Sequence, residues 1–313
     1  MNRRNFISKS AAIMLAGSAM NQKMLASATS SLSDSPSIPP MPLAAAKPNK
    51  GRIGFQLYGI RGAMEKDVIG SLRKLSEIGY SSVETFGLFE EKFFGYSMKE
   101  LDAIIKDMGM SISGGHFQRW QMLPEDVNSP EWDYWKYCIS EFKSVGAKWA
   151  IQASMPGGEP KSMDGVKRVA AHFNRVGELC RKSGLKFAFH NHPPDFKMME
   201  DVRIFDYLLK NTDPKLVYYQ IDCGNIINVG CDCIQYLRDY PGRFPLWHTT
   251  DYDAANRKSM LAGEGDVPFA EMFKQAKALG LEQLTNELHT GQNDFNACKT
   301  SFDYLKQFTW TKV

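Results

Sequence analysis

Short apolar runs alternate with amphipathic stretches along the chain from Arg52 onward. The runs are rich in β-branched and aromatic residues, which favours strands, and the longer stretches repeat their apolar positions at helical spacing. Helix ends are marked too, because Gly79 is a typical C-terminal stop and Ser97 with Glu100 forms a capping-box pattern. The pattern therefore predicts eight strand–helix units. The expected strands span residues 52–59, 81–87, 110–116, 147–154, 185–192, 216–224, 244–251 and 282–289, and the expected helices span 65–79, 97–109, 129–146, 162–184, 199–211, 233–240, 268–280 and 294–308.

The order of these elements leaves two α/β architectures. Eight strand–helix units in about 260 residues are typical of a (β/α)8 barrel, the TIM-barrel fold. A doubly wound open sheet would place a glycine-rich phosphate-binding turn after the first strand. The first strand here ends in QLYGIRG (56–62), which lacks the GxGxxG spacing. We therefore expect a single TIM-barrel domain over residues 51–313.

The N-terminal region has the layout of an export signal. Residues 1–28 carry an Arg-Arg pair, then a short apolar run and an Ala-Ser-Ala sequence that suits signal cleavage. This layout predicts a twin-arginine signal and an exported, periplasmic protein. Residues 29–50 are rich in serine and proline and are predicted to be a disordered linker. The apolar run is too short to span a bilayer, so we expect no membrane span.

Removal of the signal changes the charge balance and the partners that it suggests. The whole chain has 38 basic and 35 acidic side chains, a net charge of +3. The first 28 residues hold four of the basic side chains and no acidic one, so 34 bases then face 35 acids and the net charge is −1. With no basic stripe left, the sequence argues against a nucleic-acid partner.

The six cysteines do not form a recognisable motif. They are far sparser than in disulfide scaffolds, and Cys231 and Cys233 are separated by one residue, whereas zinc and redox pairs usually have two. Most are expected to be buried thiols. The sequence leaves open whether one disulfide forms.

Polar side chains gather at the C-terminal ends of the expected strands, where a TIM barrel carries its active site. Four of the six histidines are among them, and His190 and His192 share one face because side chains alternate along a strand. Each residue alone could be an ordinary hydrogen-bonded group, but imidazoles and carboxylates from several strands together indicate a divalent-metal shell. The strand-end residues are Gln56, Glu84, His116, Gln152, His190, His192, Asp222, His248, Asp251 and Glu287, whereas His172 and His289 are not among them.

Several motifs in the second half of the chain carry a family resemblance. They are GLKFAFHNH (184–192), YYQIDCGN (218–225), WHTTDYD (247–253), GEGDVPF (263–269) and LTNELH (284–289). Through them the chain resembles the xylose-isomerase-like TIM-barrel sugar phosphate isomerases and epimerases, over residues 52–308. The resemblance implies one divalent metal, Mn, Zn, Co or Mg, held by residues at the ends of strands five to eight. By position these ligands are His190, Asp222, His248 and Glu287.

The chain departs from the family pattern at three places, one of which is Asn225, where strand six of the family often continues to a histidine. Where the family has a glutamate at the end of strand five, this chain has His190, so a proton exchange between two glutamates lacks one partner. The motif at strand seven runs from His248 to Asp251 without the lysine that the family often carries there. Any role that needs a cation at that position is therefore missing.

The resemblance implies proton abstraction next to a sugar carbonyl, through an enediolate. We expect Glu287 to be the first candidate for the base, with His116 or His192 as the second group. Residues expected to contact the sugar are Glu84, Gln56, Gln152, Asp251 and Trp120.

Several outcomes of that chemistry stay open. Isomerisation or epimerisation is the first expectation, and β-elimination by a 3-keto-glycoside 1,2-lyase is the alternative. A sugar-binding barrel without activity and a metal-dependent endonuclease are more distant readings. The expected export favours a small, non-phosphorylated carbohydrate as the substrate. A homodimer is possible, but no sequence feature indicates it.

Overall fold

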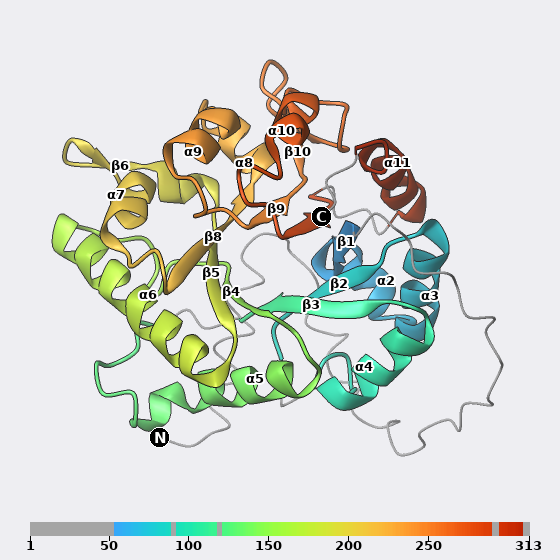
Figure 1. The fold of residues 1–313 in the computed structure, drawn as a ribbon, viewed down its shortest axis with the longest axis horizontal. Helices are drawn as coiled ribbons and strands as arrows, with labels where there is room; N and C mark the ends of the chain where they lie inside the picture. Colours follow the sequence, from blue (N-terminus) through green and yellow to red (C-terminus); the bar gives the residue numbers. More distant parts are fainter. Residues whose placement is uncertain (1–52, 89–91, 118–120, 290–293, 309–313) are drawn as a thin grey trace, which may run out of the picture. The chain divides into compact units, whose positions relative to one another are not determined.

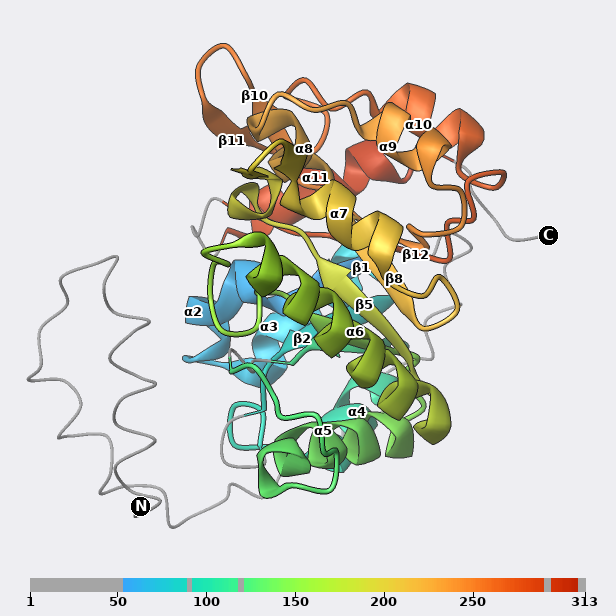
Figure 2. The ribbon, with the colours of Figure 1, turned by 90° about the vertical axis from the view of Figure 1, so that its left-hand side faces the viewer.

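Eight parallel strands close into a barrel, with the helices outside it (Figures 1 and 2). The computed structural model describes residues 53–88, 92–117, 121–289 and 294–308. The barrel order is β1-β12-β9-β8-β5-β4-β3-β2, so each barrel strand pairs with the next one along the chain. This confirms the predicted TIM barrel, whereas the expected signal (1–28) and linker (29–50) lie outside the described residues. The barrel strands are β1 (Ile53–Gln56), β2 (Ser82–Phe86), β3 (Ser111–His116), β4 (Trp149–Gln152), β5 (Lys186–His190), β8 (Val217–Asp222), β9 (Leu246–His248) and β12 (Gln283–Asn286).

The helices follow the strands as expected, and each predicted helix range contains one of them. In α4 the Ser97 hydroxyl accepts a hydrogen bond from the Glu100 N–H, and the Glu100 carboxylate accepts one from the Ser97 N–H, so the predicted capping box is confirmed. Gly79 ends α3 with φ 119°, a conformation that favours glycine. The helices are α2 (Arg61–Met64), α3 (Val68–Ile78), α4 (Met98–Asp107), α5 (Asp133–Ser144), α6 (Met163–Ser183), α7 (Ile204–Asn211), α8 (Cys223–Asn228), α9 (Cys233–Asp239), α10 (Phe269–Gln275) and α11 (Phe295–Leu305), with short 3-10 helices η1 (Leu57–Ile60), η2 (Pro130–Trp132) and η3 (Pro193–Phe196).

Three short elements differ from the sequence prediction. The helix expected from residue 199 begins only at Ile204, because the preceding residues form the two-stranded hairpin of β6 (Met198–Met199) and β7 (Val202–Arg203). Helix α8 follows β8 directly, where no helix was expected. A second hairpin, β10 (Asp251–Asp253) with β11 (Lys258–Met260), extends the connection after β9.

The inside of the barrel changes from apolar to polar along the strands. Trp149, Ile151, Ala188 and Leu246 form an apolar cluster of their own, separate from the main core between barrel and helices. Side chains two residues apart on a strand face the same way. His190 therefore follows Ala188 on the inner face of β5, and His248 follows Leu246 on that of β9. The apolar cluster thus closes the barrel beneath the polar strand ends.

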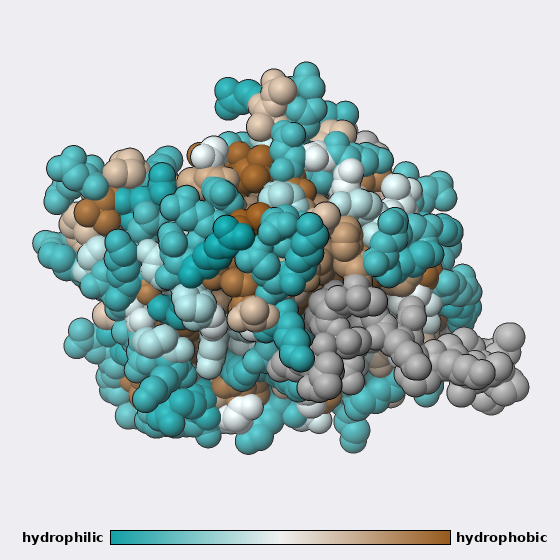
Figure 3. Space-filling model, turned by 45° about the horizontal axis from the view of Figure 1, so that its top comes forward, coloured by the Kyte–Doolittle hydropathy of each residue, from teal (hydrophilic) through white to brown (hydrophobic). Residues whose placement is uncertain are grey.

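On the face of the molecule drawn in Figure 3, hydrophilic residues predominate and hydrophobic ones emerge in small separate areas. Met198 and Val202, both on the β6–β7 hairpin, are 57% and 40% exposed. Within the described residues, no helix combines the length and the apolar character needed to cross a bilayer.

Candidate metal centre

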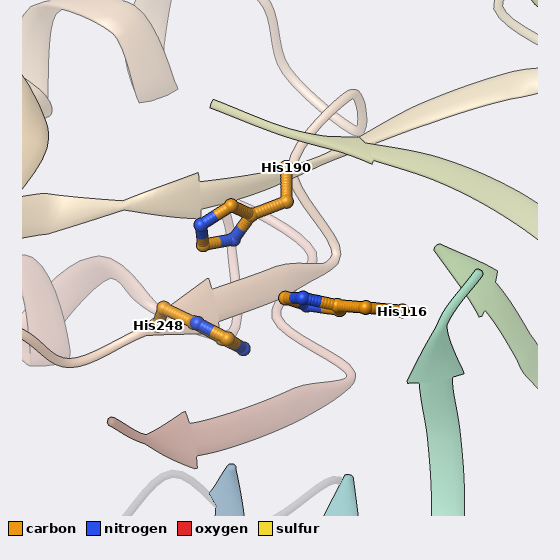
Figure 4. Close-up of side chains that lie close together, drawn as sticks. All are labelled: His116, His190 and His248. Atoms are coloured by element: carbon orange, nitrogen blue, oxygen red, sulfur yellow. The ribbon is translucent and has the colours of Figure 1, made fainter. Parts of the chain in front are cut away.

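The barrel brings the four predicted metal ligands together. His190 ends β5, Asp222 ends β8, His248 ends β9, and Glu287 follows β12 directly. All four are buried, and each offers one ligand atom within 4.8 Å of those of the other three. A second group, His116 with His190 and His248, meets the same criterion, and Figure 4 shows these three rings pointing toward a common space. The predicted clustering at the strand ends is therefore present.

Asp222 uses only one of its two carboxylate oxygens. As the N-cap of α8, its Oδ1 accepts hydrogen bonds from the Asn225 N–H at 2.8 Å and from the Thr250 hydroxyl at 2.6 Å. Its Oδ2 is buried without a hydrogen-bond partner among the described residues, 3.8 Å from His190 Nε2 and 3.4 Å from His289 Nε2. A buried carboxylate oxygen without a donor is unfavourable unless a cation lies beside it. His289 supplies one positive charge beside this oxygen, and the mixed oxygen and nitrogen donors of the cluster also fit a divalent metal.

The His248 ring lies between two carboxylates. Its Nδ1 is 2.8 Å from Glu287 Oε2, and its Nε2 is 2.8 Å from Glu84 Oε1. Burial alone would lower the pKa of His248, but Glu84 and Glu287 raise it to about 10. Burial would likewise raise the pKa of Glu84, but His248 and His116 lower it to about 2. His248 therefore carries a positive charge between two carboxylates, and it has to release a proton before a ring nitrogen can bind a metal.

A layer of three polar side chains lies under the imidazoles, and we call this layer the polar floor. It consists of Gln56, Glu84 and Gln220. Glu84 accepts hydrogen bonds from Gln56 Nε2 at 2.7 Å and from Gln220 Nε2 at 2.8 Å. All three are at most 1% exposed. Gln56 and Glu84 were expected to contact the sugar, and in the structure their polar groups are buried and bonded to each other. Gln220 was missed by the sequence analysis, although it stands two residues before Asp222 on the same face of β8.

His190 and His116 rest on this floor. Gln220 Oε1 lies 2.9 Å from His190 Nδ1 and 3.0 Å from His116 Nε2. The same His116 nitrogen is 2.9 Å from Glu84 Oε1. Burial, with His248 nearby, lowers the pKa of His190 well below its ordinary value, so this imidazole is neutral.

Two further histidines lie at the rim of the barrel. His192 is half-buried, its ring lies 4.7 Å from that of His190, and burial lowers its pKa. Nε2 of His289 lies 3.4 Å from Asp222 Oδ2 and 3.6 Å from Glu287 Oε2, and its side chain is 27% exposed. Burial alone would lower the pKa of His289, but Asp222 and Glu287 raise it well above its ordinary value. The sequence analysis left His289 out, although alternation along the chain places it with Glu287.

The remaining predicted residues take other places. Both oxygens of Asp251 accept backbone N–H bonds, four in all, from Tyr252 and from the GEGDVPF loop at Gly263, Gly265 and Val267. Its carboxylate thus holds this loop, which replaces the expected sugar contact. Gln152 is buried at the end of β4 and donates to the Ser154 carbonyl at 2.9 Å. Trp120 lies outside the described residues.

Comparisons with known proteins agree with this architecture. A family model described as xylose isomerase-like TIM barrel matches residues 72–308. Inosose dehydratase from Clostridium perfringens is 26% identical over 125 residues, which are 34% of this chain and 41% of that relative. The match thus spans less than half the length of this curated relative.

Solved structures extend the comparison over most of the chain. A sugar phosphate isomerase/epimerase from Parabacteroides distasonis has a TM-score of 0.73 at 26% identity, covering 86% of this chain and 98% of that one. A 3-keto-D-glucoside 4-epimerase from E. coli has a TM-score of 0.61 at 15% identity, covering 82% and 99%, which shows a shared fold alone. With the family match over residues 72–308, the chain belongs to the xylose isomerase-like TIM-barrel family.

Proposed function

We propose that the protein is a divalent-metal-dependent enzyme that removes a proton from the carbon next to a carbonyl group of a non-phosphorylated sugar or keto-sugar. One observation carries the proposal: Asp222 Oδ2 is buried without a hydrogen-bond partner among the described residues and faces His190 Nε2. Family membership supports an enzyme of carbohydrate chemistry. The alternative of a sugar-binding barrel without activity gives no reason to keep a buried cluster of two imidazoles and two carboxylates.

The metal would be held by His190, Asp222, His248 and Glu287. Two imidazoles with two carboxylates suit Zn, Mn or Co, and Mg less well, because Mg prefers oxygen ligands. When bound, such an ion supplies Lewis acidity toward substrate oxygens, which makes the neighbouring C–H more acidic. Glu84 would orient His248 through its bond to Nε2.

We assign the base to His192 and keep Glu287 in the ligand set. The His192 ring is half-buried at the rim. The backbone N–H of His192 donates to Asp195, but the ring itself makes no hydrogen bond with a described residue, so a ring nitrogen is available to substrate. The Glu287 carboxylate lies deeper, is 8% exposed, and has its Oε2 2.8 Å from His248 Nδ1. His116 is engaged with the polar floor, which leaves His192 as the better-placed histidine.

After proton removal, β-elimination is the outcome that this site supports best. His192 takes the proton, and the C–H electron pair shifts toward the carbonyl oxygen. The carbonyl then re-forms as a carbon–carbon double bond appears, and the leaving group departs from the adjacent carbon with its bonding electron pair and takes up a proton from water. This outcome requires one base, whereas epimerisation by two opposed carboxylates requires a second carboxylate at the rim. Within the described residues Glu84 is the remaining candidate, and two glutamine amides and two imidazoles already occupy its carboxylate. The name dehydratase of the Clostridium perfringens relative denotes an elimination too.

Isomerisation or epimerisation is the second candidate function. The Parabacteroides distasonis protein, similar over 86% of this chain, is described as a sugar phosphate isomerase/epimerase. The described site is less suited to a phosphorylated sugar than to a free sugar. The hydrogen-bonding side chains of the described site are His, Gln, Thr, Asp and Glu, with no Lys or Arg among them. The expected periplasmic location also favours a free sugar or a glycoside.

Proton NMR in deuterium oxide tests the proposal. The protein is loaded with manganese or zinc and incubated with free ketoses, aldoses and 3-keto-glycosides. We expect loss of the C–H signal next to the carbonyl, abolished by chelator and in His192→Gln. An unsaturated product would support elimination, and a rearranged sugar would support isomerisation. Absence of exchange with every sugar, in protein that holds metal, would contradict the proposal.

A further inference from the structure

Two overlapping groups of side chains compete for one cation. His116, His190 and His248 form one group (Figure 4), and His190, Asp222, His248 and Glu287 form the other. In each group the ligand atoms lie within 4.8 Å of one another. Because both groups share His190 and His248, the orientation of these two rings must decide which one holds the metal.

Gln220 sets the orientation of His190 through a chain of donors and acceptors. Its Nε2 faces Glu84 Oε2 at 2.8 Å, and this orientation of the amide is required because a carboxylate only accepts hydrogen bonds. Its Oε1 therefore faces the two imidazoles, at 2.9 Å from His190 Nδ1 and 3.0 Å from His116 Nε2. An amide oxygen also only accepts, so both of these ring nitrogens carry a hydrogen.

We propose that Gln220 is a positioning residue that directs the metal to His190, Asp222, His248 and Glu287. By accepting from Nδ1 of His190, it leaves the lone pair of Nε2 directed toward the unpaired Asp222 Oδ2, 3.8 Å away. By accepting from Nε2 of His116, it keeps that nitrogen protonated and removes it from the ligand set. The inference rests on the proposed metal site and adds a residue that touches neither metal nor substrate.

Gln56 offers a matched control. Like Gln220 it is fully buried and donates to Glu84, with Nε2 at 2.7 Å from Oε1. Its own Oε1 accepts only from the Tyr58 backbone N–H at 3.2 Å, and no imidazole bonds to it among the described residues. Gln56→Met and Gln220→Met thus make the same chemical change and each take one donor from Glu84, but only the second releases His190.

Metal titration and nitrogen NMR test the inference on the full chain. Metal-free protein is titrated with Co²⁺, followed by visible absorption, and with Zn²⁺ against a chromophoric chelator. We expect Gln220→Met to weaken binding by about 10–100-fold, the range for residues that orient metal ligands. We expect Gln56→Met to weaken binding less than Gln220→Met does, because it takes a donor from Glu84 but releases no imidazole. In ¹⁵N-histidine spectra of the metal-free wild type, His190 should be protonated at Nδ1.

The possible outcomes separate this inference from the proposed function. Wild-type protein that binds neither Co²⁺ nor Zn²⁺ would overturn the metal site itself. Metal binding by the wild type with equal affinity in Gln220→Met, or an equal loss in both glutamine variants, would overturn the role of Gln220 alone. If Gln220→Met does not fold, the wild-type spectrum still decides, because His190 protonated at Nε2 contradicts the inference.

Discussion

Asp222 Oδ2 and His190 Nε2 face each other across 3.8 Å, and Oδ2 makes no hydrogen bond with a described residue, although His289 Nε2 lies 3.4 Å from it. The other polar atom of each side chain is hydrogen-bonded. Oδ1 of Asp222 accepts from Asn225 and Thr250, and Nδ1 of His190 donates to Gln220. Rotation of either side chain would break these bonds. The two free atoms therefore stay aimed at the same space, and two acceptors aimed at one space are stable together when a cation lies between them.

Asp222→Asn tests this arrangement directly. Asparagine is a good N-cap residue and keeps an acceptor for the first turn of α8, but it removes the negative charge opposite His190. We expect affinity for Zn²⁺ or Mn²⁺ to fall by at least about 100-fold, because a ligand matters at least as much as the residues around it. Competition with a chromophoric chelator measures the change, and circular dichroism checks the fold.

Asp232→Asn is the control for that experiment. Asp232 caps α9 in the same way, accepting hydrogen bonds from the Ile234 and Gln235 N–H groups, but it is exposed. Its replacement should leave metal affinity unchanged. An undiminished affinity in Asp222→Asn would show that the unpaired oxygen is not a ligand.

Asp251→Asn is expected to destabilise the fold. The carboxylate is 1% exposed and accepts four backbone N–H bonds, three of them from the loop of residues 263–267. An amide would turn its NH₂ group toward some of these donors and leave them unpaired. We expect the free energy of unfolding to fall by about 3 kcal/mol, since buried bonds to charged groups contribute about 1.5–3 kcal/mol each and part of them remain. Urea denaturation measures this loss.

A nearby half-buried aspartate provides the comparison. Asp253 accepts hydrogen bonds from the backbone and side chain of Asn256 and from the Ala255 backbone, all local to one turn, so Asp253→Asn should change the stability by less than about 0.5 kcal/mol. If Asp251→Asn instead raised KM and left the stability unchanged, the result would support the contact between Asp251 and the sugar that the sequence analysis predicts.

The positions of the strands were predictable because they depend on short-range patterns, and so was the gathering of polar side chains at the strand ends, among which the family resemblance implied the metal ligands. The alternation of apolar and polar residues marks each strand, and parallel strands in a closed barrel must end at one rim. His190, Asp222, His248 and Glu287 therefore meet wherever the strands are read correctly. The sequence pattern did not predict helix α8, because its apolar residues continue those of β8. Only the capping role of Asp222 marks where the strand ends and the helix begins.

The pattern of apolar and polar residues did not predict how deep inside the barrel each strand-end side chain lies. Gln56 and Glu84 stand at strand ends like the ligands, but their side chains bond to each other and to Gln220 beneath the imidazoles. Which acceptor meets which donor depends on side-chain length and orientation across several strands, and these are long-range contacts. Gln220 carries no charge and lies within a strand, so composition and spacing alone did not single it out.

His192→Gln is expected to slow catalysis without loss of metal. The ring stands at the rim and is not among the clustered ligands. Loss of a general base typically reduces the rate by about 10²–10⁴-fold, and we expect a fall of kcat in this range. Metal content, measured by atomic emission, should equal that of the wild type. Loss of the metal would place His192 in the ligand set, and an unchanged kcat would return the role of base to Glu287.

A histidine far from these residues is expected to weaken the fold in acid. His172 in α6 is 1% exposed, and neither ring nitrogen has a hydrogen-bond partner among the described residues. Its ring stacks on Trp132 with 6.1 Å between the ring centroids. Burial, and to a lesser degree Arg175, lowers the pKa of His172 to about 3.

This difference in pKa makes stability depend on pH. In the unfolded chain a histidine has a pKa of about 6.5, so the unfolded state takes up the proton first as the pH falls. The stability is therefore full above about pH 6.5 and decreases between there and the folded-state pKa, by up to about 1.4 kcal/mol for each pH unit. His172→Phe keeps a ring against Trp132 and removes the titration. The variant should therefore be more stable than the wild type in acid by a margin that grows as the pH falls.

Urea denaturation at several pH values between 7 and 4 measures that margin. We expect the difference in unfolding free energy between His172→Phe and the wild type to increase by about 3 kcal/mol over this range. Other acidic and basic groups titrate in both proteins, so their effects cancel in the difference. A difference that stays constant with pH would mean that His172 takes up its proton equally in the folded and unfolded chains, which its burial without a partner makes unfavourable.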